Sequence, residues 1–169
     1  MHNKFQSILD ETPKPFVFIL IGPPLSGKDT VIRNCQLPEN TVVISRDQIL
    51  LDVYGSDNYD EAFKNVNQKQ VDAELQNSIR LASENKKNVI INMTNMTSKR
   101  RSHNLNYFDN TYTKIAIIFP ILEWDEYVDR NEKRQKEEKK FIPVSVIQSM
   151  ISSYQPIREE EGFTKVFSL

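Results

Sequence analysis

One segment predicts the architecture of the whole chain: Phe16-Val17-Phe18-Ile19-Leu20-Ile21-Gly22-Pro23-Pro24-Leu25-Ser26-Gly27-Lys28-Asp29-Thr30. Its first six residues are apolar and either branched or aromatic, which is typical of a buried strand. A loop bounded by glycines follows, and the residues after it favour the start of a helix. A strand, such a loop and a helix N-terminus in this order can hold a polyphosphate, because their backbone N–H groups converge on one anion.

The loop supplies the candidate residues for a nucleotide donor. We expect the donor to contact all nine positions from the first glycine to the threonine: Gly22, Pro23, Pro24, Leu25, Ser26, Gly27, Lys28, Asp29 and Thr30. Lys28 can reach the outer phosphates of ATP or GTP and offset their charge during transfer. Asp29 stands where the strict pattern has Ser or Thr, and its carboxylate is a suitable Mg²⁺ ligand. Two alternatives stay open: Asp29 only favours the helix N-terminus, or the loop binds nothing.

Strands and helices alternate along the rest of the chain. Short apolar runs predict strands at Phe16–Ile21, Thr41–Ile44, Asn88–Ile91, Lys114–Phe119 and, more weakly, Thr164–Ser168. Helical patterns cover Gly27–Asn34, Arg46–Val53, Asp60–Asn85, Lys99–Asn106, Glu123–Lys136 and Val144–Tyr154. This alternation predicts an α/β fold with a parallel sheet of about five strands and helices on both faces.

Composition and charge narrow the class of protein. A chain of 169 residues has the size of one domain, and Pro13 and Pro15 divide it into an N-terminal extension, residues 1–15, and a main domain, residues 16–169. One cysteine and two histidines argue against disulfides and a zinc site. No apolar run could cross a membrane, so we expect a cytoplasmic protein of cellular, organellar or viral origin. With a net charge of −1, any nucleic-acid partner must bind a local basic patch.

Polar residues follow two of the predicted strands. Asp47 comes directly after the second strand, where ligands bind in parallel sheets, and a carboxylate there can take the proton of an attacking hydroxyl. It could equally cap the helix that follows. Thr94 and Asn95 follow the third strand and are candidates for contacting an acceptor. The triplet Lys99-Arg100-Arg101 predicts a solvated helix start, with a nucleic-acid patch as the alternative.

A charged segment near the C-terminus predicts a lid. Residues 129–140, here called the lid, carry no apolar side chain. Arg130 and Arg134 lie one helical turn apart on it, so both can reach a phosphoryl group in transfer. The interspersed glutamates leave open a solvated helix with internal ion pairs.

Several ordered segments resemble the kinase domain of polynucleotide 5′-hydroxyl kinases, both the bacteriophage enzymes and the animal DNA-end-repair enzyme. The resemblance covers about residues 16–167 and rests on these segments: the loop Gly22–Thr30, Val43-Ile44-Ser45-Arg46-Asp47, Val89-Ile90-Ile91-Asn92-Met93-Thr94-Asn95, Arg130-Asn131-Glu132-Lys133-Arg134, Ile142-Pro143-Val144 and Glu161-Gly162-Phe163. It implies a P-loop kinase fold with an arginine-bearing lid, and ATP and Mg²⁺ as cofactors.

The resemblance also implies roles for single residues. Asp47 would be the general base for the acceptor hydroxyl, and Arg46 would line the acceptor site. Lys28 would hold the donor phosphates, with Arg130 and Arg134 clamping them from the lid.

The chain departs from this family at three positions. Asp29 replaces a serine, although some phage nucleotide kinases also carry Gly-Lys-Asp-Thr. Met93 replaces an aspartate, which removes a carboxylate from the acceptor or metal network. Leu50 replaces an arginine that engages the acceptor phosphate in the phage enzymes, which bears on acceptor preference. The Asp-x-Asp-Gly-Thr motif of the fused 3′-phosphatase is absent.

The function predicted from these residues is ATP-dependent phosphorylation of a 5′-hydroxyl in DNA or RNA, without a fused phosphatase. Met93 and Leu50 keep a second enzyme class open, a kinase of a nucleotide or of a hydroxymethylated base in DNA. A third class is a non-catalytic nucleotide-binding module, which the changes at Asp29 and Met93 would favour. The sequence predicts no oligomeric state.

Overall fold

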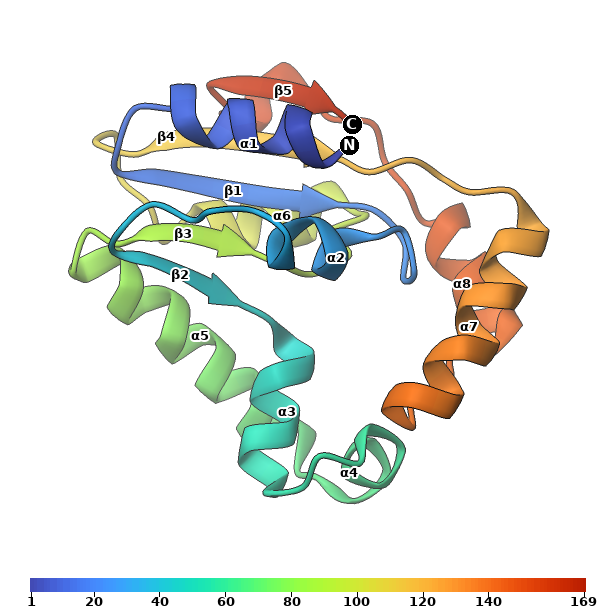
Figure 1. The fold of residues 1–169 in the computed structure, drawn as a ribbon. Helices are drawn as coiled ribbons and strands as arrows, with labels where there is room; N and C mark the ends of the chain where they lie inside the picture. The colour runs from blue at the N-terminus through green and yellow to red at the C-terminus, as the bar shows by residue number, and fades with distance from the viewer.

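The computed structural model describes all 169 residues and contains one five-stranded sheet, in which every neighbouring pair of strands is parallel (Figure 1). The strand order is β2-β3-β1-β4-β5. The strands are β1 (Phe16–Ile21), β2 (Thr41–Ile44), β3 (Asn88–Ile91), β4 (Thr113–Ile118) and β5 (Lys165–Ser168). The helices are α1 (His2–Glu11), α2 (Lys28–Arg33), α3 (Arg46–Tyr54), α4 (Tyr59–Asn65), α5 (Gln68–Glu84), α6 (Ser98–Leu105), α7 (Trp124–Glu138) and α8 (Val144–Ser152), with a 3₁₀ turn at Glu159–Glu161. The predicted α/β class with a parallel sheet of five strands is confirmed.

Strand β1 lies at the centre of the sheet and is buried along its whole length. Because successive side chains of a strand point to opposite faces, its six apolar residues divide into two sets. Val17, Ile19 and Ile21 join the core that includes residues of α5 and α6, and the alternate residues join the core beneath α1 and α2. The unbroken apolar run therefore reflects helices on both faces of the sheet.

The first 15 residues are packed onto the sheet. Phe5 and Leu9 of α1 are fully buried against the β1 side chains Phe16 and Phe18. The Lys4 ammonium donates to the carbonyl of Ser168, 2.6 Å away, so the two ends of the chain lie together, as Figure 1 shows. The expected N-terminal extension is thus part of the same core as the rest of the chain.

The prediction of one long helix over Asp60–Asn85 was wrong. The chain forms α4 and α5 instead, with extended backbone at Val66 between them. The side chain of Asn67 accepts the amide hydrogens of Lys69 and Gln70 and so begins a new helix. The apolar stripe runs through both helices, which is why periodicity alone did not reveal the break.

Helices α7 and α8 stand away from the sheet, beyond the carboxyl ends of the strands (Figure 1). Tyr127 and Asn131 are the buried residues of α7. The Asn131 amide donates to the carbonyl of Ile142 at 2.7 Å and accepts from its N–H at 3.1 Å. These paired bonds fix the connection between α7 and α8. No helix is long and apolar enough to cross a membrane.

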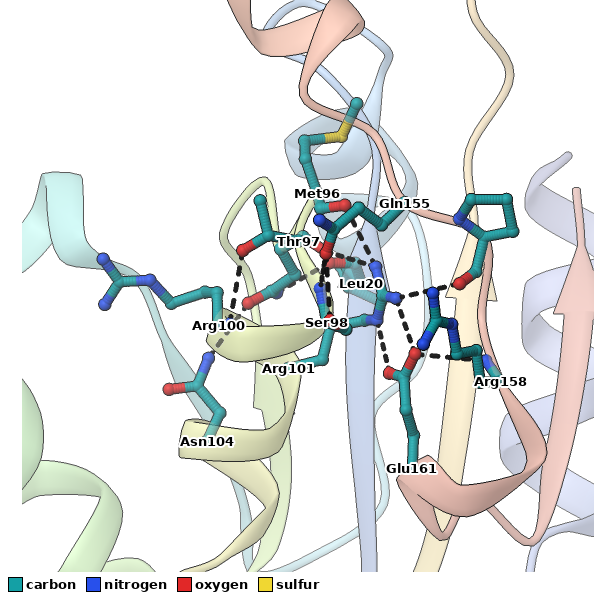
Figure 2. A network of polar contacts seen from close by, with 12 residues as sticks. Leu20, Met96, Thr97, Ser98, Arg100, Arg101, Asn104, Gln155, Arg158 and Glu161 are labelled. Carbon is teal, nitrogen blue, oxygen red and sulfur yellow. Dashed lines mark hydrogen bonds and ion pairs between the residues drawn. The ribbon is translucent and has the colours of Figure 1, made fainter.

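Arg101 is the largest fully buried side chain of the molecule. Its guanidinium makes two bonds of 2.7 Å to the carboxylate of Glu161 and also donates to the carbonyls of Asn95, Met96 and Pro156 (Figure 2). The hydrogen bonds from Arg101 hold the pKa of Glu161 below its ordinary value. Arg101 therefore ties the segment after α8 to the loop after β3, and it belongs neither to a solvated helix start nor to a nucleic-acid patch.

Candidate active site

The loop between β1 and α2 depends on two of its glycines. A Cβ on Gly22 would lie 2.8 Å from Cβ of Phe119, which is closer than side chains tolerate. Gly27, just before α2, has φ of 98°, a conformation that other residues adopt only with strain. The loop therefore fits tightly against the strand ends, with α2 beginning directly after it.

Lys28 is the first residue of α2 and lies under the loop. Its ammonium donates to the carbonyls of Gly22 and Pro23, at 2.9 and 2.6 Å, and to the hydroxyl of Ser26 at 3.1 Å. Burial lowers the pKa of Lys28 to about 8, against the pull of the Asp29 carboxylate. The side chain is thus a desolvated cation held at the loop.

Asp29 lies between the core and the lid. One carboxylate oxygen accepts from the amide of Asn92 at 2.6 Å, and the other lies 3.6 Å from the guanidinium of Arg134. Mg²⁺ in nucleotide sites needs only one or two carboxylates, because phosphates and water supply its other ligands. No cluster of three acidic, histidine or cysteine side chains exists to hold a metal without phosphate. The single carboxylate of Asp29 therefore fits a magnesium ion that binds together with the nucleotide phosphates.

Asp47 lies on the first turn of α3, and its carboxylate faces the cleft. One oxygen accepts from the hydroxyl of Tyr59 at 3.1 Å, and the other is paired with the ammonium of Lys140. Burial raises the pKa of the Asp47 carboxyl, but Lys140 and Tyr59 outweigh it and hold that pKa below its ordinary value. Ser45 occupies the N-cap position of α3, and the bonds of Asp47 go to other elements.

The two lid arginines both face the nucleotide loop. Arg130 donates to the carbonyl of Leu25 at 2.9 Å. Arg134 lies near Asp29 and also bonds Glu138, one turn further along α7, at 2.9 Å. The structure thus combines the two interpretations of this helix, because an intrahelical ion pair is present and both guanidinium groups remain at the cleft.

The predicted acceptor residues occupy three different environments. Arg46 lines the cleft, but its guanidinium is bonded to Gln68 and Asp72 of α5. Thr94 also lines the cleft, and its carbonyl accepts from the N–H of Gly22. Asn95 is buried, and its amide donates to the carbonyl of Leu20 at the end of β1. Its side chain therefore lies inside the protein, against the backbone of β1.

One cleft of about 1020 Å³ brings the predicted donor and base residues together. Lys28, Asp29, Asp47, Arg130 and Arg134 all line it. Sequence analysis missed several further lining residues, among them Tyr59, Lys140 and Phe141. These residues lie in segments whose position depends on tertiary packing, whereas Asn92, which directly follows β3, also lines the cleft.

Comparison with known proteins was made at the level of families and of solved structures. The AAA_33 family, described as an AAA domain, matches residues 17–157. No curated protein matches the chain.

Similar folds occur among solved structures, all with low sequence identity. The Pnkp1/Rnl/Hen1 complex contains a chain that is 24% identical, with a TM-score of 0.55 over 72% of the present chain and 40% of the other. The PezAT toxin–antitoxin system of the human pathogen Streptococcus pneumoniae gives 17% identity and a TM-score of 0.59 over 99% and 73%. A gluconokinase from Sinorhizobium meliloti 1021 gives 12% identity and a TM-score of 0.52 over 93% and 83%. The chain thus spans less than half of the Pnkp1-complex chain that it matches, and it shares the fold of P-loop kinases.

Proposed function

The chain belongs to the AAA_33 family of AAA domains, and we propose that it transfers the γ-phosphate of ATP to the 5′-hydroxyl of a polynucleotide. One observation carries the proposal. The Asp47 carboxylate, the only predicted base, lies in the same cleft as the buried Lys28 and the two lid arginines. A carboxylate beside a phosphate-binding loop suits a reaction in which a hydroxyl attacks a phosphoryl group.

The residues divide the reaction between them. The acceptor oxygen forms a bond to the γ-phosphorus as the bond to the β–γ bridging oxygen breaks, and ADP leaves. Asp47 takes the proton that the acceptor hydroxyl gives up. Lys28, Arg130 and Arg134 offset the charge that spreads over the phosphoryl oxygens, because such catalysis consists mostly of positioning and electrostatic stabilisation. Bound Mg²⁺ would neutralise phosphate charge, and Asp29 would hold it.

The rim of the cleft supports a nucleic acid as the acceptor. Phe63 of α4 and Phe141 of the segment after α7 both line the cleft, with 51% and 40% of their surfaces exposed. Exposed aromatic rings near cationic side chains are a common platform for unpaired bases. The resemblance of the strand ends and lid to polynucleotide kinases, and the similar fold in the Pnkp1/Rnl/Hen1 complex, support the same acceptor class.

A transfer assay with radiolabelled ATP tests this function. The acceptors to compare are 5′-hydroxyl DNA, 5′-hydroxyl RNA, mononucleotides and hydroxymethylated duplex DNA, each with a 5′-phosphorylated control oligonucleotide. We expect label on the 5′-hydroxyl oligonucleotides and none on the 5′-phosphorylated ones. ATP binding without transfer to any acceptor would instead indicate a non-catalytic binding module.

A small-molecule acceptor is the second candidate. The PezAT structure and the gluconokinase cover 99% and 93% of the chain, which is more than the 72% covered in the Pnkp1 complex. Label that enters a mononucleotide but no oligonucleotide would favour this candidate.

Lys28→Met should lower turnover by about 10²–10³, the scale for one lost electrostatic stabiliser. In the wild type, bound phosphates favour the charged lysine and raise its pKa, so ATP affinity should fall as pH rises through about 8. Calorimetry from pH 6 to 10 should show this slope in the wild type and no slope in Lys28→Met. The matched control is Lys136→Met, on the exposed side of α7. Turnover within about threefold of wild type would exclude Lys28 from the donor site.

ATP binding should depend on magnesium through Asp29. Without the metal, the carboxylate and the phosphates repel each other, by about 1 kcal/mol or more at contact distances. We therefore expect chelation to weaken ATP binding by about fivefold or more in the wild type, and by much less in Asp29→Asn. Calorimetric titration with and without EDTA measures this difference, with Asp125→Asn as the exposed control. Equal wild-type affinity under both conditions would contradict the role of Asp29.

A further inference from the structure

The lid contacts both halves of the cleft. On the donor side, Arg130 donates to the carbonyl of Leu25, and Arg134 lies 3.6 Å from Asp29. On the other side, Lys140 follows the end of α7 by two residues and pairs with Asp47. One continuous segment therefore contacts the nucleotide loop and the carboxylate that faces the acceptor.

Lys140 is held in place from several directions. Its side chain is only 7% exposed, and its ammonium lies 4.0 Å from the centre of the Tyr59 ring. The hydroxyl of that tyrosine bonds the free oxygen of Asp47, so Lys140, Tyr59 and Asp47 form a closed set of contacts from three elements. The next residue, Phe141, donates its N–H to the carboxylate of Asp60 on α4. A lysine buried in this way has little of the freedom of a surface ion pair.

The contacts leave Asp47 able to bind an acceptor. A carboxylate has about four lone-pair positions on its two oxygens. Lys140 occupies one position on one oxygen and Tyr59 one on the other. The remaining positions can receive an acceptor hydroxyl, while the two donors fix the plane of the carboxylate.

We propose that Lys140 is a positioning residue for the Asp47 carboxylate, carried by the same lid segment whose arginines face the donor loop. Lys140 keeps Asp47 ionised and oriented when the lid lies against the cleft. The proposal rests on the proposed function, because it assumes that Asp47 is the general base. When the lid arginines contact the donor loop, Lys140 is therefore also in place to orient the Asp47 carboxylate on the acceptor side.

Other charged groups face Asp47 and must be weighed against Lys140. Arg134 of α7 and Lys28 of α2 lie near it, and Tyr59 of α4 bonds it directly. Burial and the Asp47 carboxylate raise the pKa of the Tyr59 phenol, so Tyr59 stays a neutral donor. Lys140 is the cation that bonds the carboxylate, and its removal should leave burial of Asp47 as the main influence on that group.

The first test measures the Asp47 carboxyl by ¹³C NMR titration of aspartate-labelled protein, with Asp47→Asn to assign the signal. An opposite charge at this distance shifts a carboxyl pKa by about 1–3 units. We expect the midpoint of Asp47 to rise by about that amount in Lys140→Met, and to return close to the wild-type value in Lys140→Arg. Lys139→Met, on the neighbouring residue outside this cleft, should titrate like the wild type. An unchanged midpoint in Lys140→Met would overturn the proposal.

The second test measures transfer to the 5′-hydroxyl oligonucleotide against pH. The wild type should have level activity between about pH 5 and 7, whereas Lys140→Met should lose activity toward pH 5 because Asp47 becomes protonated there. At pH 7, its kcat should fall by about 10–100-fold, the scale of a misplaced reacting group, with KM for ATP unchanged. A uniform loss at all pH values that Lys140→Arg does not rescue would overturn the proposal. If wild-type protein transfers no phosphate, the proposed function fails. The NMR titration still decides whether Lys140 controls the ionisation of the Asp47 carboxyl.

Discussion

Asp47→Asn should lower the turnover of phosphoryl transfer by about 10²–10⁴-fold, the usual contribution of a general base. The amide keeps the shape of the side chain and an oxygen that can accept from Tyr59 or Lys140, but it cannot take up a proton. The loss should therefore appear in turnover rather than in KM for ATP, since the base acts on the acceptor oxygen. The melting temperature should fall modestly, because the buried ammonium of Lys140 loses its partner charge but keeps an oxygen that accepts its hydrogen bond.

The matched control for this prediction is Asp52→Asn, an exposed carboxylate on the same helix. Transfer of label from ATP, calorimetric ATP binding and thermal unfolding should be measured on both variants. If Asp47 only capped α3, Asp47→Asn would be nearly silent in all three measurements, because Asn caps a helix about as well as Asp. Full transfer activity on the true acceptor would remove Asp47 from the mechanism.

Arg101→Met should lower the free energy of unfolding by about 3–5 kcal/mol, the usual effect of removing one partner of a buried ion pair. Neither charged group can be solvated by water instead, because the side chains of Arg101 and Glu161 are 0% and 4% exposed. The substitution would strand the Glu161 carboxylate and leave the carbonyls of Asn95 and Met96 without their donor. Urea unfolding followed by circular dichroism measures the loss.

Two further variants sharpen this prediction. Arg100→Met, on the adjacent exposed position of α6, should stay within about 0.5 kcal/mol of the wild type. The double variant Arg101→Met/Glu161→Leu should recover part of the loss, because a buried pair replaced by apolar groups leaves no unpaired charge. Losses that simply add in the double variant would show that the two side chains do not act as a pair.

Much of the fold follows from local patterns of the sequence. The run from Phe16 to Ile21 had to be a strand buried on both faces, because no polar residue interrupts it. Lys28 and Asp47 could be placed at one edge of the sheet because each follows a strand, and parallel strands end on the same side. The apolar run and the position of a residue after a strand are both visible within a short stretch of sequence. Both features could therefore be predicted from the sequence alone.

What escaped prediction depends on contacts between distant segments. The pairing of Lys140 with Asp47 joins residues 93 positions apart, and nothing in the charged lid singles out Lys140 from its neighbours. Arg101 lies in a basic triplet typical of a surface, and only its pairing with Glu161, 60 positions later, explains its burial. The break at Val66 escaped because the capping role of Asn67 was hidden within a continuous apolar stripe.

The position of α1 has a practical consequence for work with this protein. Met1 and His2 line the cleft beside the nucleotide loop, and the ammonium of Lys4 holds the carbonyl of Ser168, so the C-terminus lies close to the N-terminus. An affinity tag, a surface linkage or a fluorescent label at the N-terminus would therefore begin in the cleft, and one at the C-terminus would begin close to the N-terminus. Tag-free protein, or attachment through the exposed outer face of α5, keeps immobilisation and labelling from competing with ligands.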